Sequence, residues 1–358
     1  MVEKHRLLVL NPGSTSTKIA VFDDNEIVFQ ETIRHSVEEL SKYKKIFDQY
    51  EYRKNIILNT LAKNDIDINS FTAIIGRGGV LKPIEGGTYR IGEKMLLDLK
   101  AEVQGEHASS LGGIIAYEIA QELGVEGFIV DPVVVDELAE VARISGLKEI
   151  ERRSIFHALN QKAVARRYAK SKGKKYEDMN LIIAHLGGGI SVAAHSKGKA
   201  IDVANALNGD GPFSPERSGG LPVGDLIELA FSNKYTIEDM KKMITGNGGL
   251  VSYLGTADAM EVGKRIKDGD EYARSIYYAM AYQVAKEIGS LAAVLKGQVD
   301  GILLTGGIAN DKLFTSWIEE MVKFISQVYI YPGEDELTAL AEGGLRVLKG
   351  EEKVKEYK

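Results

Sequence analysis

A short polar turn near the start of the chain carries the residue types best suited to phosphate chemistry. The stretch that begins at Asn11 reads Asn-Pro-Gly-Ser-Thr-Ser-Thr-Lys, between two apolar runs. Gly13 lets backbone N–H groups approach an anion, and the hydroxyls of Ser14 and Ser16 add hydrogen-bonding groups. Asn11 presents an amide oxygen that suits a hydrated Mg²⁺ ion, and Lys18 stands at the mouth of the second run. The sequence therefore predicts a phosphate-binding turn.

Two common nucleotide-binding patterns do not fit this turn. The lysine-bearing P-loop, G-x-x-x-x-G-K-[ST], is absent, and we expect a strand rather than a helix after the turn. No predicted strand is followed by G-x-G-x-x-G, the fingerprint of a Rossmann dehydrogenase. The turn therefore indicates another class of phosphate-binding protein.

Two arginines stand in glycine-rich loops where they could hold an anion. Arg77 follows a short apolar run, residues 71–75, whose brevity predicts a buried parallel strand. Ligands collect at the carboxyl ends of such strands. Arg217 is the only cation in the irregular loop of residues 210–222, a kind of loop that often carries ligand sites. Each arginine has an alternative to anion binding. Arg77 could be a solvated residue in a turn, and Arg217 could form a structural ion pair.

A histidine and an aspartate in the first half are further candidates. His107 precedes an expected helix over residues 111–123, where it could meet an anion or simply cap the helix. Asp131 directly follows an expected strand over residues 127–130, a favoured position for a metal-bound or phosphate-bound water. Capping of the next turn is the alternative for Asp131.

The second half of the chain repeats the plan of the first. Residues 7–29 give an apolar run, a small-residue turn, a second run, a tight turn and a third run, and residues 181–204 follow the same order. The small-residue turn of the second copy is Gly187, Gly188 and Gly189. Two halves with one plan predict two similar domains that face each other across a cleft.

Two segments near the end of the chain also offer binding groups. An expected buried strand over residues 301–304 runs into Gly306 and Gly307, where a flat group such as adenosine can lie against the backbone. Asp335 and Glu336 open the last expected helix. Acids in a first helical turn usually complement the helix dipole, so a metal role there needs other support.

Composition restricts the class of protein. A chain of 358 residues with 44% hydrophobic residues predicts about two globular domains, and we place the boundary between residues 172 and 173. The net charge of −6, without a basic stripe, argues against a nucleic-acid partner. The absence of cysteine excludes disulfides and thiolate catalysis. No apolar run suits a membrane span or a signal peptide, so we expect a cytoplasmic protein.

Seven segments, in this order, resemble motifs of the acetate and butyrate kinase family, within the sugar kinase, heat-shock and actin-like ATPase superfamily. They are NPGSTSTK at 11–18, IIGRGG at 74–79, RRSIFHALN at 152–160, HLGGGIS at 185–191, SPERSGG at 214–220, LLTGGIAND at 303–311 and EDELTALAEGG at 334–344. The resemblance implies an α/β fold with two similar ribonuclease H-like (actin-like ATPase) domains around a central cleft. It also leaves room for the last helix to pack back on the first domain.

The resemblance implies ATP/ADP as cofactor and Mg²⁺ near Asn11 and an acid at Asp335 or Glu336. Arg77 and Arg217 would hold a carboxylate and the transferring phosphoryl group.

Further roles follow from the same resemblance. Asp131 would orient an arginine or a metal-bound water, and His185 would touch the γ-phosphoryl group in the transition state. Gly306 and Gly307 would lie beneath the nucleotide, and His107 matches a less certain histidine of the family.

Departures from the acetate kinase pattern favour the butyrate and branched-chain branch. Gly188 stands where acetate kinases carry asparagine, and the segment around His107 lacks their Pro-Leu-His-Asn-Pro run. The expected reaction is reversible, direct phosphoryl transfer from ATP to butyrate or isobutyrate, giving an acyl phosphate. Acetate or propionate as substrate is one alternative, and an actin-like or chaperone-like ATPase without acyl phosphate chemistry is another. The resemblance also suggests a homodimer or a higher homo-oligomer.

Overall fold

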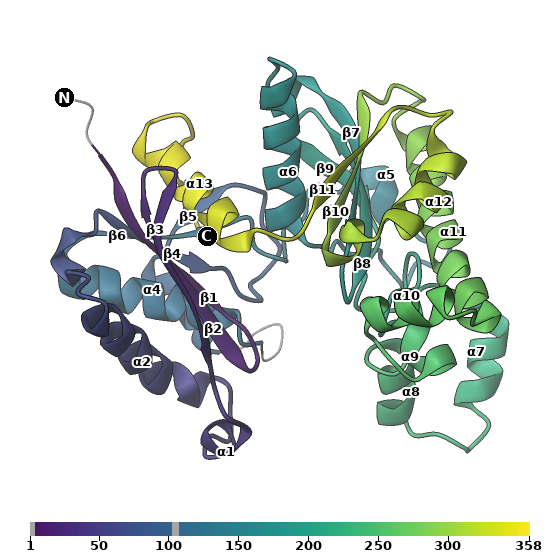
Figure 1. Cartoon of the computed structure of the whole chain (residues 1–358), viewed down its shortest axis with the longest axis horizontal. Coiled ribbons are helices and arrows are strands. Elements are labelled where there is room, and N and C mark those ends of the chain that lie inside the picture. Colours follow the sequence, from purple (N-terminus) through teal and green to yellow (C-terminus); the bar gives the residue numbers. More distant parts are fainter. Residues whose placement is uncertain (1–3, 102–106) are drawn as a thin grey trace. The chain divides into compact units, whose positions relative to one another are not determined.

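The computed structural model describes residues 4–101 and 107–358, which form two compact units (Figure 1). Unit 1 comprises Met1–Val135 and Asp335–Lys358, and unit 2 comprises Asp136–Glu334. Each unit is built on its own β-sheet.

The sheet of unit 1 has the strand order β12-β5-β6-β4-β1-β2-β3. Its strands are β1 (Arg6–Pro12), β2 (Ser16–Asp23), β3 (Glu26–Arg34), β4 (Ala73–Arg77), β5 (Thr88–Arg90), β6 (Glu126–Val130) and β12 (Lys355–Glu356). The first three strands form an antiparallel meander, and β4 lies parallel to both β1 and β6. The carboxyl ends of β1, β4 and β6 therefore meet at one edge, which carries Asn11, Arg77 and Asp131.

Helices cover both faces of this sheet. The helices of unit 1 are α1 (Val37–Leu40), η1 (Phe47–Gln49), α2 (Tyr50–Lys63), η2 (Ile68–Ser70), α3 (Glu93–Lys100), α4 (Ser110–Leu123) and α13 (Glu336–Leu348). Gly76 of β4 faces α4, whereas its neighbour Ile75 faces Gly344 of α13. Because successive strand residues point to opposite faces, α4 and α13 pack on opposite sides of the sheet.

The sheet of unit 2 has the order β11-β10-β7-β8-β9. Its strands are β7 (Asn180–Leu186), β8 (Ile190–Ser196), β9 (Lys199–Val203), β10 (Gly301–Gly306) and β11 (Val328–Pro332). An antiparallel meander is again followed by two parallel strands, so this sheet repeats the order β6-β4-β1-β2-β3 of unit 1. The repeat predicted from residues 7–29 and 181–204 is confirmed.

Unit 2 carries more helices than its repeat requires. They are α5 (Glu140–Arg143), α6 (Ala158–Ser171), η3 (Tyr176–Asp178), α7 (Val223–Ala230), α8 (Ile237–Ile244), α9 (Gly249–Leu254), α10 (Ala259–Lys267), α11 (Glu271–Val294), η4 (Gly307–Asn310) and α12 (Lys312–Val322). Ile183 and Leu303 pack with α6, whereas Ile182 and Leu304 pack with α11 and α12 on the other face. Helix α11 packs in this core with one apolar stripe, which has Met280 among its buried residues.

The units divide the chain differently from the predicted domains 1–172 and 173–358. The chain crosses between units at Val135/Asp136 and again at Glu334/Asp335. Helix α6 lies before the predicted boundary yet packs on β7 and β10, and α13 packs on β1, β4 and β6. Composition does not mark either crossing, because packing partners rather than linker residues define these units. The central cleft of the predicted fold stays a prediction.

In the described residues, no helix combines the length and the apolarity that a bilayer crossing requires.

Candidate functional site

The first candidate group lies at the strand ends of unit 1, where Glu336 holds two predicted residues. One carboxylate oxygen of Glu336, Oε2, accepts a hydrogen bond from Asn11 Nδ2 at 2.5 Å. The other, Oε1, forms an ion pair with Arg77 Nη1. Asp335, one residue earlier, has a left-handed backbone with φ 31° and does not cap α13 with its side chain. The first turn of α13 thus meets the ends of β1 and β4.

Asp131 is fixed at the end of the neighbouring strand β6. It is 1% exposed, and its Oδ1 accepts a hydrogen bond from the Gly87 N–H at 2.6 Å. Its backbone has φ 37°, an uncommon value for a residue with a side chain. The geometry holds the carboxylate in one orientation at the edge that also carries Arg77.

His107 lies just before α4. Its Nδ1 accepts a hydrogen bond from the Ser109 N–H at 3.2 Å and lies 2.7 Å from Ser109 Oγ. The neutral ring therefore carries its proton on Nε2. Desolvation, and then the positive charge of Arg77, lower the pKa of His107 below its ordinary value. This arrangement resembles the capping role given above as the alternative, and it places the ring within electrostatic reach of Arg77.

A close backbone contact sets the position of Arg77. A Cβ atom on Gly76 would overlap the Gly112 carbonyl oxygen, and one on Gly112 would lie 2.6 Å from the Arg77 carbonyl oxygen. The first turn of α4 therefore packs directly against the end of β4, which only glycine allows at these two positions.

The second candidate group lies at the Gly187–Gly188–Gly189 turn of unit 2. Ser214 Oγ donates to the Gly188 carbonyl oxygen at 2.8 Å. This hydrogen bond joins the loop of residues 210–222, which carries Arg217, to the glycine turn. The guanidinium of Arg217 fills the space where a side chain of Gly189 would stand. The glycine turn and the loop that carries Arg217 therefore pack directly against each other.

Arg217 has hydrogen-bond donors to spare. Its Nη1 donates to the Ala206 carbonyl oxygen at 3.2 Å, whereas its buried Nε has no acceptor in the described part of the chain. Burial lowers the pKa of Arg217, and Glu216 partly opposes this effect. A half-buried, charged guanidinium with an unfilled donor is suited to bind an anion.

His185, the last residue but one of β7, lies within a cluster of polar side chains. Its Nδ1 lies 2.9 Å from Asn160 Oδ1, and its Nε2 lies 3.5 Å from Glu334 Oε1. Asn160 also donates from Nδ2 to the Glu334 carbonyl oxygen at 3.1 Å, which orients its amide. The His157 ring stacks on His185 with centroids 4.3 Å apart.

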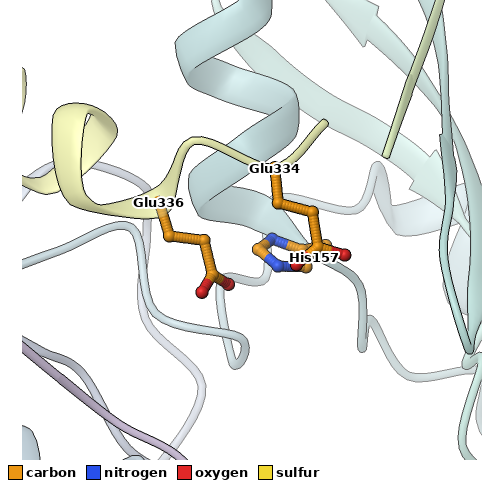
Figure 2. Close-up of side chains that lie close together, drawn as sticks. All are labelled: His157, Glu334 and Glu336. Atoms are coloured by element: carbon orange, nitrogen blue, oxygen red, sulfur yellow. The ribbon is translucent and has the colours of Figure 1, made fainter. Parts of the chain in front are cut away.

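Figure 2 shows His157 beside Glu334, and a ring nitrogen of His157 lies within 4.8 Å of a Glu334 carboxylate oxygen. His157 also caps α6 by accepting a hydrogen bond from the Asn160 N–H at 3.3 Å. This cap explains why α6 begins at Ala158.

A pocket of about 970 Å³ adjoins this cluster within unit 2. Gly187, Gly188 and Glu334 line it on the side of the glycine turn, and Gly307 lines it at the end of β10. Its other walls come from α10, α11 and the η4–α12 segment, among them Asp258, Lys264, Tyr277, Asn310, Asp311 and Lys312. Gly306, with φ 91°, closes the end of β10 against Leu186.

The structure gathers the predicted residues into two groups, one in each unit. Unit 1 holds Asn11, Gly13, Ser14, Ser16, Lys18, Arg77, His107, Asp131, Asp335 and Glu336. Unit 2 holds His185, Gly187, Gly188, Gly189, Arg217, Gly306 and Gly307. Lys18 is exposed and pairs across the strands with Asn11, so both side chains lie on one face of the hairpin. The meeting of Arg77 with Arg217 stays a prediction.

Three site residues escaped the sequence prediction. His157 and Asn160 lie in the segment RRSIFHALN, which the resemblance singled out without giving either a role. Arg53 lies in the first turn of α2 and donates to the carbonyl oxygens of Gly13 and Ser14. A charged helix residue is ordinarily solvated, and no local pattern marks this one.

Comparison with solved structures gives the class of fold. The acetate kinase of Porphyromonas gingivalis superposes with a TM-score of 0.78 at 18% identity, over 95% of this chain and 99% of that one. A propionate kinase of Francisella tularensis subsp. tularensis SCHU S4 gives 0.75 at 18% identity, over 95% and 99% of the two chains. The chain therefore has the two-domain α/β fold of these kinases, as predicted.

Sequence comparison gives the family. The Acetokinase family profile matches residues 144–328. Butyrate kinase 1 of Clostridium acetobutylicum is 61% identical over 99% of this chain and 100% of its own length. Butyrate kinase 2 of the same organism is 60% identical over the same shares. The chain belongs to the acetokinase family.

Proposed function

We propose that the chain transfers the γ-phosphoryl group of ATP to butyrate or isobutyrate, giving ADP and an acyl phosphate in a reversible reaction. Identity of 61% and 60% to two butyrate kinases, over 99% of the chain, is the observation that carries this proposal.

The main obstacle in such a reaction is electrostatic. A carboxylate is already ionised at neutral pH, so it needs no general base to act as the nucleophile. It must instead approach an anionic γ-phosphate, and like charges at close range repel by several kcal/mol in a dry site. Arg77 and Arg217 are proposed to neutralise the two reactants. The unfilled Nε of Arg217 supports this role, as do the donors of Arg77 that Glu336 does not use.

The pocket of unit 2 is the proposed adenosine site, with Gly306 and Gly307 beneath the nucleotide. The phosphates would then follow the Gly187–Gly188–Gly189 turn, because Gly187 and Gly188 line the same pocket as Gly307. The turn of unit 1, from Gly13 to Lys18, is proposed to contact phosphoryl oxygens as well.

His185 is the proposed donor to the transferring phosphoryl group. Since Asn160 accepts the Nδ1 proton, a proton on Nε2 makes the ring a cationic donor at that atom. Stacking of His157 restricts how the His185 ring can turn. Asp131 and His107 are proposed to orient Arg77 and nearby water.

Mg²⁺ is the proposed metal, held by Asn11 and by Asp335 or Glu336. The donor set fits, because these side chains offer only oxygen ligands once Asn11 Nδ2 donates to Glu336. Bound there, the ion would neutralise phosphate charge. The Glu336 carboxylate also contacts both Asn11 and Arg77.

A series of carboxylates tests the substrate. Purified protein with ATP is assayed for acyl hydroxamate with acetate, propionate, butyrate and isobutyrate, and butyrate or isobutyrate should give the highest kcat/KM. Discrimination by one methylene is worth about 1 to 3 kcal/mol, so the ranking is measurable. A preference for acetate or propionate would refute the assignment within the family.

Direct in-line transfer is the proposed course of the reaction. We expect no phosphorylated protein to form from labelled ATP and to pass its label to butyrate. Isolation of such a species on the kinetic pathway would overturn direct transfer but leave the substrate assignment intact.

The alternative without acyl phosphate chemistry has its own test. Arg217→Ala should abolish butyrate-dependent ADP formation if Arg217 binds a reactant. Unchanged butyrate-dependent turnover would favour an ATPase of the actin-like or chaperone-like kind.

Family resemblance also supports a homodimer or higher homo-oligomer that works in the cytoplasm, where ATP is available. Light scattering on the purified protein measures the oligomeric state, and a monomeric mass at working concentration would contradict this part of the proposal.

A further inference from the structure

A buried arginine contacts the turn of residues 13–16, which joins β1 to β2. Arg53, on α2, is 1% exposed. Its Nη1 donates to the carbonyl oxygens of Gly13 at 2.8 Å and Ser16 at 3.2 Å, and its Nη2 donates to that of Ser14 at 3.0 Å. Gln49 Oε1 accepts from Nε at 3.1 Å and from Nη2 at 2.8 Å, which fixes the plane of the guanidinium.

Arg53 thus engages three of the four carbonyl groups of residues 13–16. The remaining one, on Thr15, accepts from the His35 N–H at 2.9 Å. Carbonyl oxygens would repel an anion, and here all four are engaged by donors of the chain itself. Within the described ranges, the N–H groups of Ser14 and Thr15 donate to no protein acceptor. The exposed side of the turn therefore offers N–H and hydroxyl groups, the pattern that binds phosphate.

The charge of Arg53 is not balanced by an acid. Among the described residues no carboxylate pairs with Arg53, although it is almost fully buried. His35, which shares Thr17 Oγ1 with Arg53, is neutral near pH 7 and adds no second charge, because burial and then the charge of Arg53 lower its pKa to about 4. A buried positive charge beneath a turn of free N–H groups acts on an anion through a poorly screening medium.

We propose that Arg53 is a positioning residue for phosphoryl binding, which holds the turn of residues 13–16 with the N–H groups of Ser14 and Thr15 outward and lends the turn positive charge. The inference rests on the proposed function only for the identity of the phosphoryl donor, ATP. The competing explanation is that Arg53 merely stabilises the β1–β2 hairpin.

Two substitutions of Arg53 and one control separate these explanations. Arg53→Lys keeps the charge but cannot reach three carbonyl groups at once, and Arg53→Met removes the charge while keeping an apolar stem of similar length. Lys54→Met is the matched control, since Lys54 is the next residue of α2 and pairs with Glu118 and Glu122, away from the turn.

Kinetics give the first readout. For folded Arg53→Lys we expect KM for ATP to rise about tenfold, the value of one or two charge-assisted hydrogen bonds, with KM for butyrate within about twofold of wild type. Arg53→Met should have the larger effect, and Lys54→Met should behave as wild type. A merely structural arginine would reduce the fraction of active protein and leave KM for ATP unchanged, and that result overturns the proposal.

Amide hydrogen exchange gives a readout that does not depend on turnover. Adding ATP with Mg²⁺ should protect the Ser14 and Thr15 amides in the wild type and in Lys54→Met, but not in Arg53→Lys. If Arg53→Met fails to fold, Arg53→Lys alone tests the proposal. Protection of the Ser14 and Thr15 amides in Arg53→Lys to the same degree as in the wild type would refute it. If the wild type makes no acyl phosphate from butyrate, the proposed function fails, while protection of these amides by ATP continues to test Arg53.

Discussion

At the scale of single residues, the missing side chain of Gly189 leaves the space that the Arg217 guanidinium occupies. Gly189→Ala should therefore displace Arg217 while the backbone, which has no positive φ there, tolerates the change. We expect kcat/KM to fall about a hundredfold, comparable to the loss of one charge-stabilising donor. Steady-state kinetics measures the loss of kcat/KM, and thermal melting checks that the fold tolerates the substitution.

Gly224→Ala is the matched control, because nothing lies within 4 Å of the added methyl group. It should retain wild-type kinetics. Full activity in Gly189→Ala would mean that the observed position of Arg217 is unimportant for turnover.

His35 should make stability depend on pH. Its pKa of about 4, set first by burial and then by Arg53, lies below the ordinary 6.5, and Glu39 opposes the shift only in part. The unfolded chain therefore binds a proton first as the pH falls. The free energy of unfolding should be unaffected by His35 above pH 6.5 and fall by at most about 3 kcal/mol between pH 6.5 and 4.

Urea unfolding of wild type and His35→Gln at several pH values measures this contribution. Glutamine can keep the contact with Thr17 but does not titrate, so the variant should lose less stability across the window. Parallel curves for the two proteins would contradict the assignment.

At the scale of elements, the packing of β4 on α4 depends on Gly76. A methyl group there would overlap the Gly112 carbonyl oxygen and the Ala116 side chain, in a helix that cannot shift without moving Arg77. Gly76→Ala should reduce the free energy of unfolding by about 2 to 3 kcal/mol, as overpacking of a core does. Chemical denaturation measures the loss.

Gly289→Ala in α11 should raise the free energy of unfolding, whereas Gly76→Ala should lower it. Nothing lies within 4 Å of the added methyl group, so the helix should gain about 0.5 to 1 kcal/mol from the better propensity of alanine. A stability loss in both variants would mean that backbone conformation, not local space, governs these glycines.

At the scale of the whole molecule, the proposed reaction needs residues from both units. Arg77 and Asn11 belong to unit 1, whereas Arg217, His185 and the proposed nucleotide pocket belong to unit 2. Transfer in a water-excluding site would then require the units to close on the reactants. Small-angle scattering should report a smaller radius of gyration with ATP analogue and butyrate together than with either alone. No compaction would contradict this expectation.

Local patterns in the sequence determined the repeated core of both sheets. Three apolar runs with a small-residue turn and a tight turn favour an antiparallel meander, so β1–β2–β3 and β7–β8–β9 were predictable. The glycines at the ends of β4, β7 and β10 likewise marked where strands stop and a ligand can approach. Arg77 and His185 were predictable as candidates because they stand next to those ends.

Only the tertiary structure decided which residues support the turns and how the chain is divided. Arg53 contacts Gly13 from about forty residues away, a separation that no local pattern encodes. Helix α13 joins unit 1 because its glycines fit Val130 and Ile75, and α6 joins unit 2 because it packs on β7 and β10. Periodicity and turn chemistry act between near neighbours, whereas these choices depend on the shape and charge of distant segments, which exist only after folding.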